Sequence, residues 1–436
     1  MVHARAVALR ALVALDTGER ERLQIAEEGR HVDGRELAFA IELGHGVLRR
    51  ERLLDHVLLG LAHRGLPKHP KLIAALRLGA YQLLFVDGMP RHAAVHETVS
   101  LVKINKGFAN AVLRRIADAV QDRPADPARP TEELALGPRR SLQLPKPLPA
   151  DELERLAIVH SLPDWLVQRV DAQHGRAAVQ AVCAAAVAVP GIFLRCRADV
   201  DRAALAEALQ AAGVETEPAG HPRLLRWTDG VSPFATDAFK AGRFVVQDAT
   251  ALRAVEALAA QPGEVIVDLC AAPGTKTTWL AEMVAPNGKV WAFDPDQRRR
   301  AMIHDNLQRL GQQELVTVVD TAAALPKAQR VLVDAPCSNS GVLGRRVEAR
   351  YRLDPEVFAE MASLQQRLLR QALALVEPGG TVVYSTCSVD REENDAVVDA
   401  VLGAGDAPAC EVVQRETTMP AAGEHDGGYF AVLRRS

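Results

Sequence analysis

The chain has 436 residues, of which 48% are hydrophobic and 25% are charged, and its formal net charge is −3. These values are ordinary for a globular protein of two or three domains. The six cysteines show no CxxC spacing, which argues against a disulfide scaffold and a structural zinc site and favours the reducing cytoplasm. No apolar run reaches the ~20 residues that a membrane-spanning helix needs, and the N-terminal segment has the pattern of an amphipathic helix and not of a signal peptide.

Charge is distributed unevenly along the chain. Residues 1–125 contain 19 Lys and Arg against 14 Asp and Glu, a net charge of +5, whereas the remainder has 33 against 41 and a net charge of −8. A basic end on an acidic chain suggests an anionic partner that binds locally. Solvated helix faces that happen to be rich in arginine would explain the same counts equally well.

The first part of the chain has the periodicity of helices. Apolar residues recur at three- and four-residue spacing, which predicts a helical bundle, in the segments 4–15, 35–50, 71–85, 93–104 and 108–120. The next stretch, 122–149, holds seven prolines and little periodicity, as in a linker. We therefore expect a helical domain over residues 1–125 and a Pro-rich linker over 126–150.

The pattern changes after residue 150. A helix near 162–174, an apolar strand and a second helix over 202–212 predict a small α+β subdomain at 151–240. Over 241–436, helical stretches alternate with apolar strands at 265–269, 290–293, 315–319, 331–333 and 382–384. This alternation is typical of a parallel, doubly wound, Rossmann-like sheet. The predicted fold class is thus multidomain: an all-α bundle, a small α+β insert and an α/β domain.

Ligands of such sheets bind beyond the carboxyl ends of the strands. The turn after the first strand, DLCAAPGTKT, has small residues that permit close backbone approach, and a helix with free N–H groups follows it. It matches neither the dinucleotide fingerprint GxGxxG nor the P-loop. The next two strands end at Asp294 and Asp320. A carboxylate at the position of Asp294, the end of the second strand, commonly binds ribose hydroxyls, although a single strand-end aspartate is more often a cap than a ligand.

Two further strand ends carry cysteine. VLVDAPCSNSG contains Asp334 and Cys337, and VVYSTCSVDREEN contains Cys387. A single strand-end cysteine is usually a small buried hydrophobe, but these two lie in polar loops beside an aspartate and an acidic EEN run. If the strands are neighbours, both thiols face one pocket. No histidine lies close by in the sequence, so we expect no metal site.

These motifs together resemble a known family. DLCAAPGTKT, DAPCSNSG, YSTCS and EEN, in this order and spacing, are similar to the RNA cytosine-C5 methyltransferases of the Sun type. RHAAVHETVSLVK and GFANAVLRRI resemble the helical domain shared with the antitermination factor NusB, and LRCRADVDRAALAEALQAAGV and FVVQDATA resemble the family's RNA-facing insert. The combination is most similar to the bacterial enzymes that act on 16S rRNA.

The resemblance implies a reaction, a cofactor and roles for individual residues. Cys387 would be the thiolate that adds to C6 of cytosine, Cys337 would assist release of the methylated base, and Asp334 would hydrogen-bond the N3 edge of the base. S-adenosylmethionine would be the cofactor. The partner would be RNA, and the similarity to the enzymes that act on 16S rRNA makes 16S rRNA the expected one. The cofactor-binding residues implied in this way are Cys270, Ala271, Ala272, Pro273, Gly274, Thr275, Lys276, Asp294, Asp320 and Asp334.

Some alternatives stay open at this level. The same reaction on tRNA or at another rRNA position fits the motifs, and so does a non-catalytic RNA-binding assembly factor. Cys337 could instead be the nucleophile, because a Pro-Cys dipeptide has that role in the DNA cytosine-C5 enzymes. Thr275 stands where the family usually has glycine, in Gly274-Thr275-Lys276-Thr277, and so could affect the binding of the cofactor.

Overall fold

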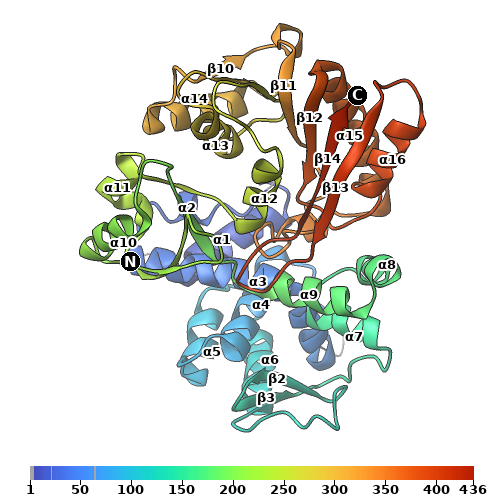
Figure 1. Ribbon diagram of the computed structural model, residues 1–436. Helices are drawn as coiled ribbons and strands as arrows, with labels where there is room; N and C mark the ends of the chain where they lie inside the picture. The colour runs from blue at the N-terminus through green and yellow to red at the C-terminus, as the bar shows by residue number, and fades with distance from the viewer. Residues whose placement is uncertain (1–3, 21, 63–64) are drawn as a thin grey trace. The chain divides into compact units, whose positions relative to one another are not determined.

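The computed structural model describes residues 4–20, 22–62 and 65–436, and the chain divides into two compact units. Unit 1 comprises Met1–Val187 and unit 2 comprises Ala188–Ser436. Figure 1 shows both units, with labels on the helices and on part of the strands. Among the described residues, no helix is long and apolar enough to cross a membrane.

The N-terminal half of unit 1 is a helical bundle, as the periodicity predicts. Its members are α1 (Ala4–Asp16), α2 (Ile25–Glu28), α3 (Gly34–Leu61), α4 (Pro70–Phe85), α5 (Arg91–Ser100) and α6 (Lys106–Ala119). Helix α3 begins at an N-cap aspartate, Asp33, whose side chain accepts hydrogen bonds from two free N–H groups of the first turn. Apolar residues at helical spacing, such as Leu43, Leu54 and Leu113, are fully buried.

The expected linker contains a small sheet. Strands β1 (Val120–Gln121), β2 (Glu133–Gly137) and β3 (Arg140–Gln143) pair in the antiparallel order β1-β3-β2. The buried Glu133 carboxylate accepts hydrogen bonds from Arg123, Arg129 and the backbone N–H of Asp126, which closes the Pro-rich turn onto the sheet. The segment 126–150, which we expected to be a Pro-rich linker, therefore contains two paired strands. Strands this short leave little periodicity to detect in the sequence.

Three further helices belong to unit 1: α7 (Glu152–Val159), α8 (Asp164–His174) and α9 (Arg176–Val187). They are held to α3 by Arg52, which donates two 2.8 Å hydrogen bonds to the carboxylate of Asp164, and by Ser161, which accepts from the N–H of Leu53. The range 151–240, expected to form one subdomain, is therefore divided between the two units. Polar contacts between distant segments of the sequence cause this division.

The basic residues of unit 1 have different surroundings. Arg5 donates to Gln82 of α4, and Arg10 pairs with Glu28 at 3.2 Å, so both are engaged within the bundle. Arg114 and Arg115 are exposed on α6. Only some of the arginines counted in the sequence are thus available to an anionic partner.

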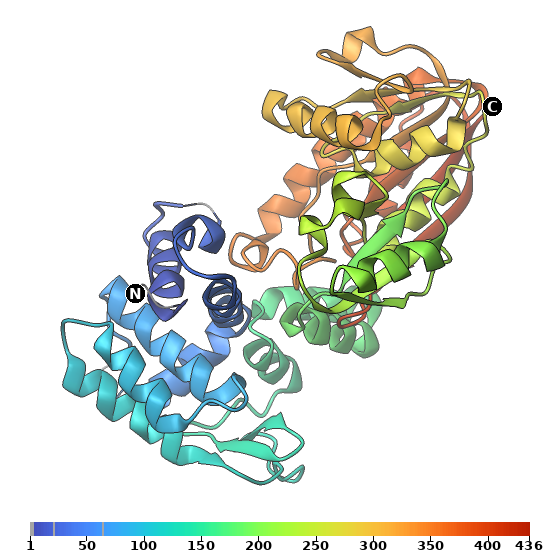
Figure 2. The same ribbon diagram turned by 90° about the vertical axis from the view of Figure 1, so that its left-hand side faces the viewer.

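Unit 2 begins with a four-stranded antiparallel sheet of order β5-β6-β4-β7. Its elements are β4 (Ile192–Cys196), α10 (Arg202–Ala211), β5 (Val214–Pro218), β6 (Leu224–Gly230), η1 (Pro233–Ala235), α11 (Asp237–Lys240) and β7 (Phe244–Val246). Leu205 and Leu209 of α10 pack against Leu194, Leu225 and Phe244 of the strands. Figure 2 shows these elements in green.

The rest of unit 2 is a seven-stranded sheet of order β10-β9-β8-β11-β12-β14-β13. Its strands are β8 (Val265–Asp268), β9 (Lys289–Phe293), β10 (Val316–Val319), β11 (Ala328–Asp334), β12 (Val376–Thr386), β13 (Cys410–Thr418) and β14 (Gly428–Arg435). The first five in spatial order are parallel, which confirms the doubly wound prediction. Strands β13 and β14, which we did not predict, add an antiparallel edge.

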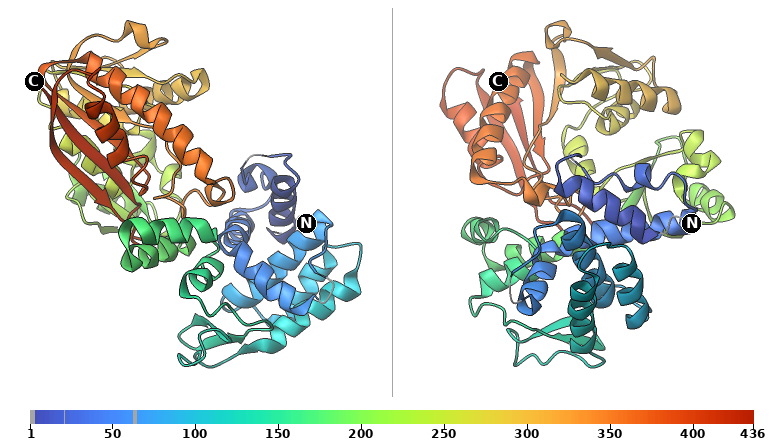
Figure 3. Two further views of the ribbon diagram at one scale, coloured as in Figure 1. Left: turned by 90° about the vertical axis from the view of Figure 1, so that its right-hand side faces the viewer. Right: turned by 180° about the vertical axis from the view of Figure 1, so that it is seen from behind.

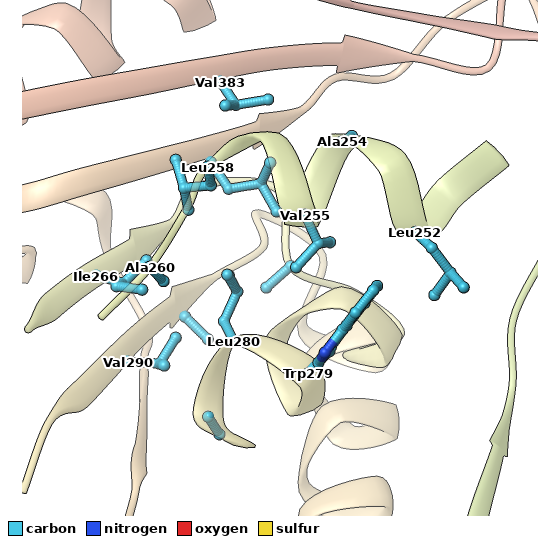
Figure 4. Close-up of a cluster of buried hydrophobic side chains, with 14 of the residues drawn as sticks. Leu252, Ala254, Val255, Leu258, Ala260, Ile266, Trp279, Leu280, Val290 and Val383 are labelled. Carbon is cyan, nitrogen blue, oxygen red and sulfur yellow. The ribbon is translucent and has the colours of Figure 1, made fainter. Parts of the chain in front are cut away.

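Helices cover both faces of this sheet. They are α12 (Ala249–Ala257), α13 (Thr275–Val284), α14 (Gln297–Leu310), α15 (Pro355–Leu375) and α16 (Asp395–Gly403), with the short turns η2 (Ala322–Ala324) and η3 (Ala349–Tyr351). Alternate strand residues face the two helical layers: Ile266 packs in the core of α12–α14, and Val267 packs in that of α15 and α16. Figure 3 shows α15 and α16 against one face, and Figure 4 shows Leu258, Trp279 and Leu280 in the core of the other face. The carboxyl ends of β8, β9, β10, β11 and β12 consequently meet at one edge of the sheet.

Candidate active site

The turn between β8 and α13 is shaped by one glycine. Gly274 has φ = +98°, and a Cβ placed on it would lie 3.2 Å from Ile303 of α14, so both conformation and space favour glycine here. Thr275 is the first residue of α13 and is not among the described residues with positive φ, so a β-branched side chain is accommodated without backbone strain. Burial raises the pKa of the Cys270 thiol, which therefore packs as a small apolar group.

A carboxylate that we did not predict lies at the start of this turn. Asp268, the last residue of β8, is buried and accepts a 2.7 Å hydrogen bond from the hydroxyl of Thr277. Burial raises its pKa to about 7, and its Oδ1 atom has no hydrogen-bond partner. An unpartnered buried carboxylate oxygen is costly unless a ligand satisfies it. Its position at a strand end, one residue before Leu269-Cys270, was the available signal in the sequence.

The two aspartates that follow β9 and β10 differ in exposure. Asp294 is buried, accepts a 3.1 Å hydrogen bond from the N–H of Asp296 and lies 3.5 Å from Arg299. The side chain of Asp320 is 90% exposed and pairs with Arg300 at 3.3 Å. Asp294 is therefore enclosed and engaged within its own loop, whereas Asp320 lies at the open rim of the sheet edge.

Asp334 forms an ion pair at the end of β11. Its carboxylate lies 2.5 Å from the Nζ of Lys276 and accepts a 3.0 Å hydrogen bond from Ser385, its register partner on β12. Burial alone would lower the pKa of Lys276, but the charge and hydrogen bond of Asp334, together with Cys387 and Asp268, outweigh burial and raise it. The ammonium group has three N–H donors, and only one is needed for Asp334.

The two loop cysteines lie side by side. Cys337 and Cys387 are 50 residues apart in the sequence, yet their sulfur atoms are 3.0 Å apart, and the carbonyl oxygen of the Asn339 side chain lies 3.4 Å from Cys387. The hydrogen bond with Cys387, together with burial, raises the pKa of the Cys337 thiol well above its ordinary value. The adjacent strands β11 and β12 thus bring the two sulfurs together, whereas the expectation that both thiols face one pocket is met only by Cys387, because Cys337 is not among the described residues that line the cavity beside it.

The acidic EEN run holds the two cysteine loops. The carboxylate of Glu393 accepts hydrogen bonds from the backbone N–H and hydroxyl of Ser338, at 2.8 and 2.5 Å, and from Gln365 at 3.1 Å. Asn394 accepts a 2.6 Å hydrogen bond from Thr386. These buried hydrogen bonds explain why the sequence has a polar EEN run beside the second cysteine, which the packing of apolar side chains does not explain.

Backbone segments also approach closely behind Cys387. The N–H of Gly341 donates to the carbonyl of Cys387 at 3.0 Å, and the N–H of Gly427 donates to the carbonyl of Gly341 at 2.8 Å. A Cβ on Gly341 would lie 2.7 Å from the Gly427 backbone and 2.8 Å from the Cys387 carbonyl oxygen. The loops that contain Gly341, Cys387 and Gly427 therefore pack backbone against backbone. This packing, which fixes the position of Cys387, leaves no space for a side chain at position 341.

Two neighbouring cavities open beside these groups. The first, of about 120 Å³, is lined by Lys276, Asp334 and Cys387 together with residues of α12 and β14. The second, of about 380 Å³, is lined by Cys270, Ala271, Thr275, Lys276 and Asp334 among others. Cys337, Asp294 and Asp320 are not among the described residues that line either cavity. No group of three or more described His, Cys, Asp and Glu residues is arranged to hold a metal ion.

Two protein-family models match the chain. The model described as the NusB family matches residues 2–118, and the model described as 16S rRNA methyltransferase RsmB/F matches residues 255–433. The second match contains the β8–α13 turn, both cysteine loops and the EEN run.

Curated relatives match nearly the whole chain. A protein of Bacillus subtilis (strain 168) named probable ribosomal RNA small subunit methyltransferase B is 30% identical over 417 residues, which cover 91% of this chain and 88% of that protein. A protein of the same name from Synechocystis sp. (strain ATCC 27184 / PCC 6803 / Kazusa) is 33% identical over 380 residues, which cover 84% of this chain and 80% of that protein.

Solved structures share the fold. The crystal structure of PH0851 has a TM-score of 0.75 at 25% identity and covers 98% of both chains. The structure of NSun6 from Pyrococcus horikoshii with SFG has a TM-score of 0.56 at 18% identity and covers 63% of this chain and 98% of that chain. At that identity the second likeness establishes the fold alone.

Proposed function

Because the chain belongs to the RsmB/F family of 16S rRNA methyltransferases, we propose that it methylates C5 of one cytosine in 16S rRNA through a covalent bond to Cys387. The methyl donor is S-adenosylmethionine. The observation that carries this proposal is the cavity in which Cys387, Asp334 and Lys276 meet. A nucleophile, a proton donor and an orienting carboxylate are the groups that this addition requires.

Features of unit 2 fit the cofactor. The unpartnered Oδ1 of Asp268 suits the amino group of a methionine moiety, and the Gly274 turn allows close backbone approach. We assign the ribose hydroxyls to the buried Asp294 and the adenine edge to Asp320, which lies at the rim. When bound, S-adenosylmethionine supplies an electrophilic methyl group on a positively charged sulfur.

Cys387 supplies the nucleophile. Cytosine C5 is a weak nucleophile until the Cys387 sulfur, having lost its proton to solvent, adds to C6. The new S–C6 bond breaks the C5–C6 π bond, whose electron pair is shared between C5 and, through C4, N3, so that C5 reacts as an enamine carbon. Cys387 is the thiol among the described residues lining the smaller cavity, together with Lys276 and Asp334. After C5 has taken the methyl group, loss of the C5 proton and departure of Cys387 restore the double bond.

Lys276 and Asp334 act as one unit on the N3 edge of the base. Addition at C6 places negative charge on the ring, and a proton donor at N3 stabilises it. Both carboxylate oxygens of Asp334 already accept hydrogen bonds or an ion pair, whereas the ammonium of Lys276 has donors to spare. We therefore assign the proton to Lys276 and the orientation of that donor to Asp334.

Cys337 assists release of the product. Its pKa is raised first of all by the hydrogen bond with Cys387, so it is a neutral thiol before the reaction. Once the Cys387 sulfur is bonded to C6, that sulfur no longer shares a proton with Cys337. The Cys337 thiol can then lose its proton to solvent more readily, and the resulting thiolate takes the C5 proton. The C5–H electron pair re-forms the C5–C6 double bond as the Cys387 thiolate leaves, and N3 returns its proton to Lys276.

Unit 1 contributes RNA binding in this proposal. It matches the NusB family, and the exposed part of α6 and the residues before it carry Lys103, Lys106, Arg114 and Arg115. Phosphate contacts from such residues position RNA without reading its sequence.

Bisulfite sequencing of total RNA from cells with and without the gene tests the reaction, the substrate and the position together. We expect one 16S cytosine to lose its protection in the deletion strain and to regain it when the wild-type gene, but not a Cys387→Ala version, is returned. Unchanged protection of every 16S cytosine would refute the rRNA assignment. A change confined to tRNA would move the substrate there, and no change in any RNA would favour a non-catalytic assembly factor.

The glycine contact behind Cys387 yields a prediction about rate. Gly341→Ala forces a Cβ against the Cys387 carbonyl, and a shift of about 1 Å in a nucleophile costs on the order of 10²-fold in rate. We expect that loss in kcat, with the affinity for the cofactor unchanged. Gly220→Ala is the matched control, because a Cβ there meets nothing within 4 Å. Equal rates for the two variants would show that the three loops do not position Cys387.

A further inference from the structure

The loop between β11 and α15 contains arginines that hold it in place. Within residues 341–354, the arginine loop, Arg345 donates to the carboxylate of Asp426 at 2.8 Å and to the carbonyl of Gly191 at 3.2 Å, and lies 3.4 Å from Asp248. Arg350 is buried and donates to the carbonyl of Leu343 at 3.0 Å. Both side chains are used inside the protein, and they fix the backbone of the loop.

Arg346 has a different position. Its backbone N–H donates to the carbonyl of Val342 at 2.8 Å, but its side chain is exposed and lines the larger cavity, together with Thr275 and Lys276. Of the described cations that line this cavity, Lys276 pairs with Asp334 and Arg345 with two carboxylates. Arg346 alone among these cations has a guanidinium without a carboxylate partner.

Apart from Arg346, acidic groups outnumber the cations that line this cavity. The four carboxylates of Asp248, Asp268, Asp334 and Asp426 line it, and two cations, Lys276 and Arg345, pair with three of them. Carboxylates in a partly enclosed cavity repel a phosphate more strongly than they would in water. The smaller cavity, which contains Cys387, shares Lys276 and Asp334 with the larger one, so a base bound there lies next to the larger cavity. Such a base must leave its stack, and its backbone phosphates remain outside, at the mouth of the two cavities. An exposed arginine on a rigid loop at that mouth would offset the repulsion.

We propose that the guanidinium of Arg346 binds a phosphodiester of the RNA adjacent to the target cytosine. This inference rests on the proposed function, because it takes RNA as the substrate. The planar guanidinium presents paired N–H donors that match two phosphate oxygens. Arg345 and Arg350 pre-order the loop, so little conformational entropy is lost when the contact forms.

The test uses the full-length protein and 16S rRNA transcribed in vitro. Arg346→Gln should raise the KM for this RNA by about 10-fold and reduce the slope of log affinity against log salt by ~0.7–0.9, the value for one phosphate contact. The kcat should remain within about 2-fold, because the contact is equal in ground and transition states. Arg346→Lys should recover part of the affinity. The matched control is Arg352→Gln, since Arg352 is exposed on the same loop but is not among the described residues lining the cavity.

Either of two results would overturn the inference, and another result would overturn only the proposed function. An unchanged KM and salt slope for Arg346→Gln, or changes equal to those of Arg352→Gln, would show that Arg346 is a solvated surface residue. A weaker affinity for S-adenosylmethionine alone, measured by calorimetry without RNA, with RNA affinity unchanged, would assign Arg346 to the carboxylate of the cofactor. If the wild-type protein binds the RNA but does not methylate it, the proposed function fails, and the salt slope of binding still decides the role of Arg346.

Discussion

A Cys337→Ala protein incubated with S-adenosylmethionine and substrate RNA should accumulate a covalent protein–RNA adduct that survives denaturing electrophoresis. Its turnover should fall by at least ~10²-fold, the range for loss of a proton-transfer group. The physical reason is the order of events: Cys387 still adds to C6, but the thiol that lies 3.0 Å from it is absent when the product must be released. The methylated base then remains attached to Cys387.

Cys387→Ala is the paired variant. It should form no adduct and show no methyl transfer, since the remaining thiol at position 337 is not among the described residues lining the smaller cavity. The double variant should behave like Cys387→Ala. If Cys387→Ala accumulated the adduct and Cys337→Ala did not, the roles of the two cysteines would be exchanged.

Lys276→Met should reduce kcat by about 10²–10⁴-fold, because it removes the proposed proton donor to N3. The Asp334 carboxylate raises the pKa of Lys276, so this side chain is charged below and throughout the range in which the enzyme is assayed. Its charge would be lost only as the pH rises through that raised pKa. We therefore expect the ratio of wild-type to variant rates to be constant between about pH 6 and pH 9.

Lys289→Met serves as the control for loss of a lysine. Lys289 begins β9, at the opposite end of that strand from the site, and donates to the carbonyl of Glu314. Its replacement should leave kcat unchanged. A Lys276→Met enzyme with wild-type kcat, or one whose defect disappeared at low pH, would contradict the assignment of the N3 proton to Lys276.

Local patterns in the sequence predicted the helical bundle and the parallel strands well. The segments 71–85 and 108–120 correspond to α4 and α6, and the strand predicted at 265–269 is β8 with one residue fewer. These elements follow from side-chain periodicity, which a chain carries locally whatever its neighbours are. The predicted strand at 382–384 belongs to the buried C-terminal half of β12, which is longer because residues on both sides of this segment also pair with β11 and β14.

Elements stabilised by distant partners were harder to predict. β14 is apolar along six consecutive residues and lies between β12 and β13, so it lacks the alternation of a half-exposed strand. β2 and β3 lie in a Pro-rich stretch and depend on the buried Glu133 for their turn. Asp268 was missed for a similar reason, because only its burial distinguishes it from other strand-end aspartates.

The sequence by itself determined the order of the elements, the loops that carry the reactive groups and the family to which the chain belongs. Each of these depends on residues within a few positions of one another. Only the tertiary structure decided which groups meet: the sulfurs of Cys337 and Cys387 across 50 residues, and the ion pair of Lys276 with Asp334. It also separated Asp294, which is buried, from Asp320, which is exposed at the rim. Strand order, register and burial set these distances and exposures, and all three arise from packing between segments that are far apart in the chain.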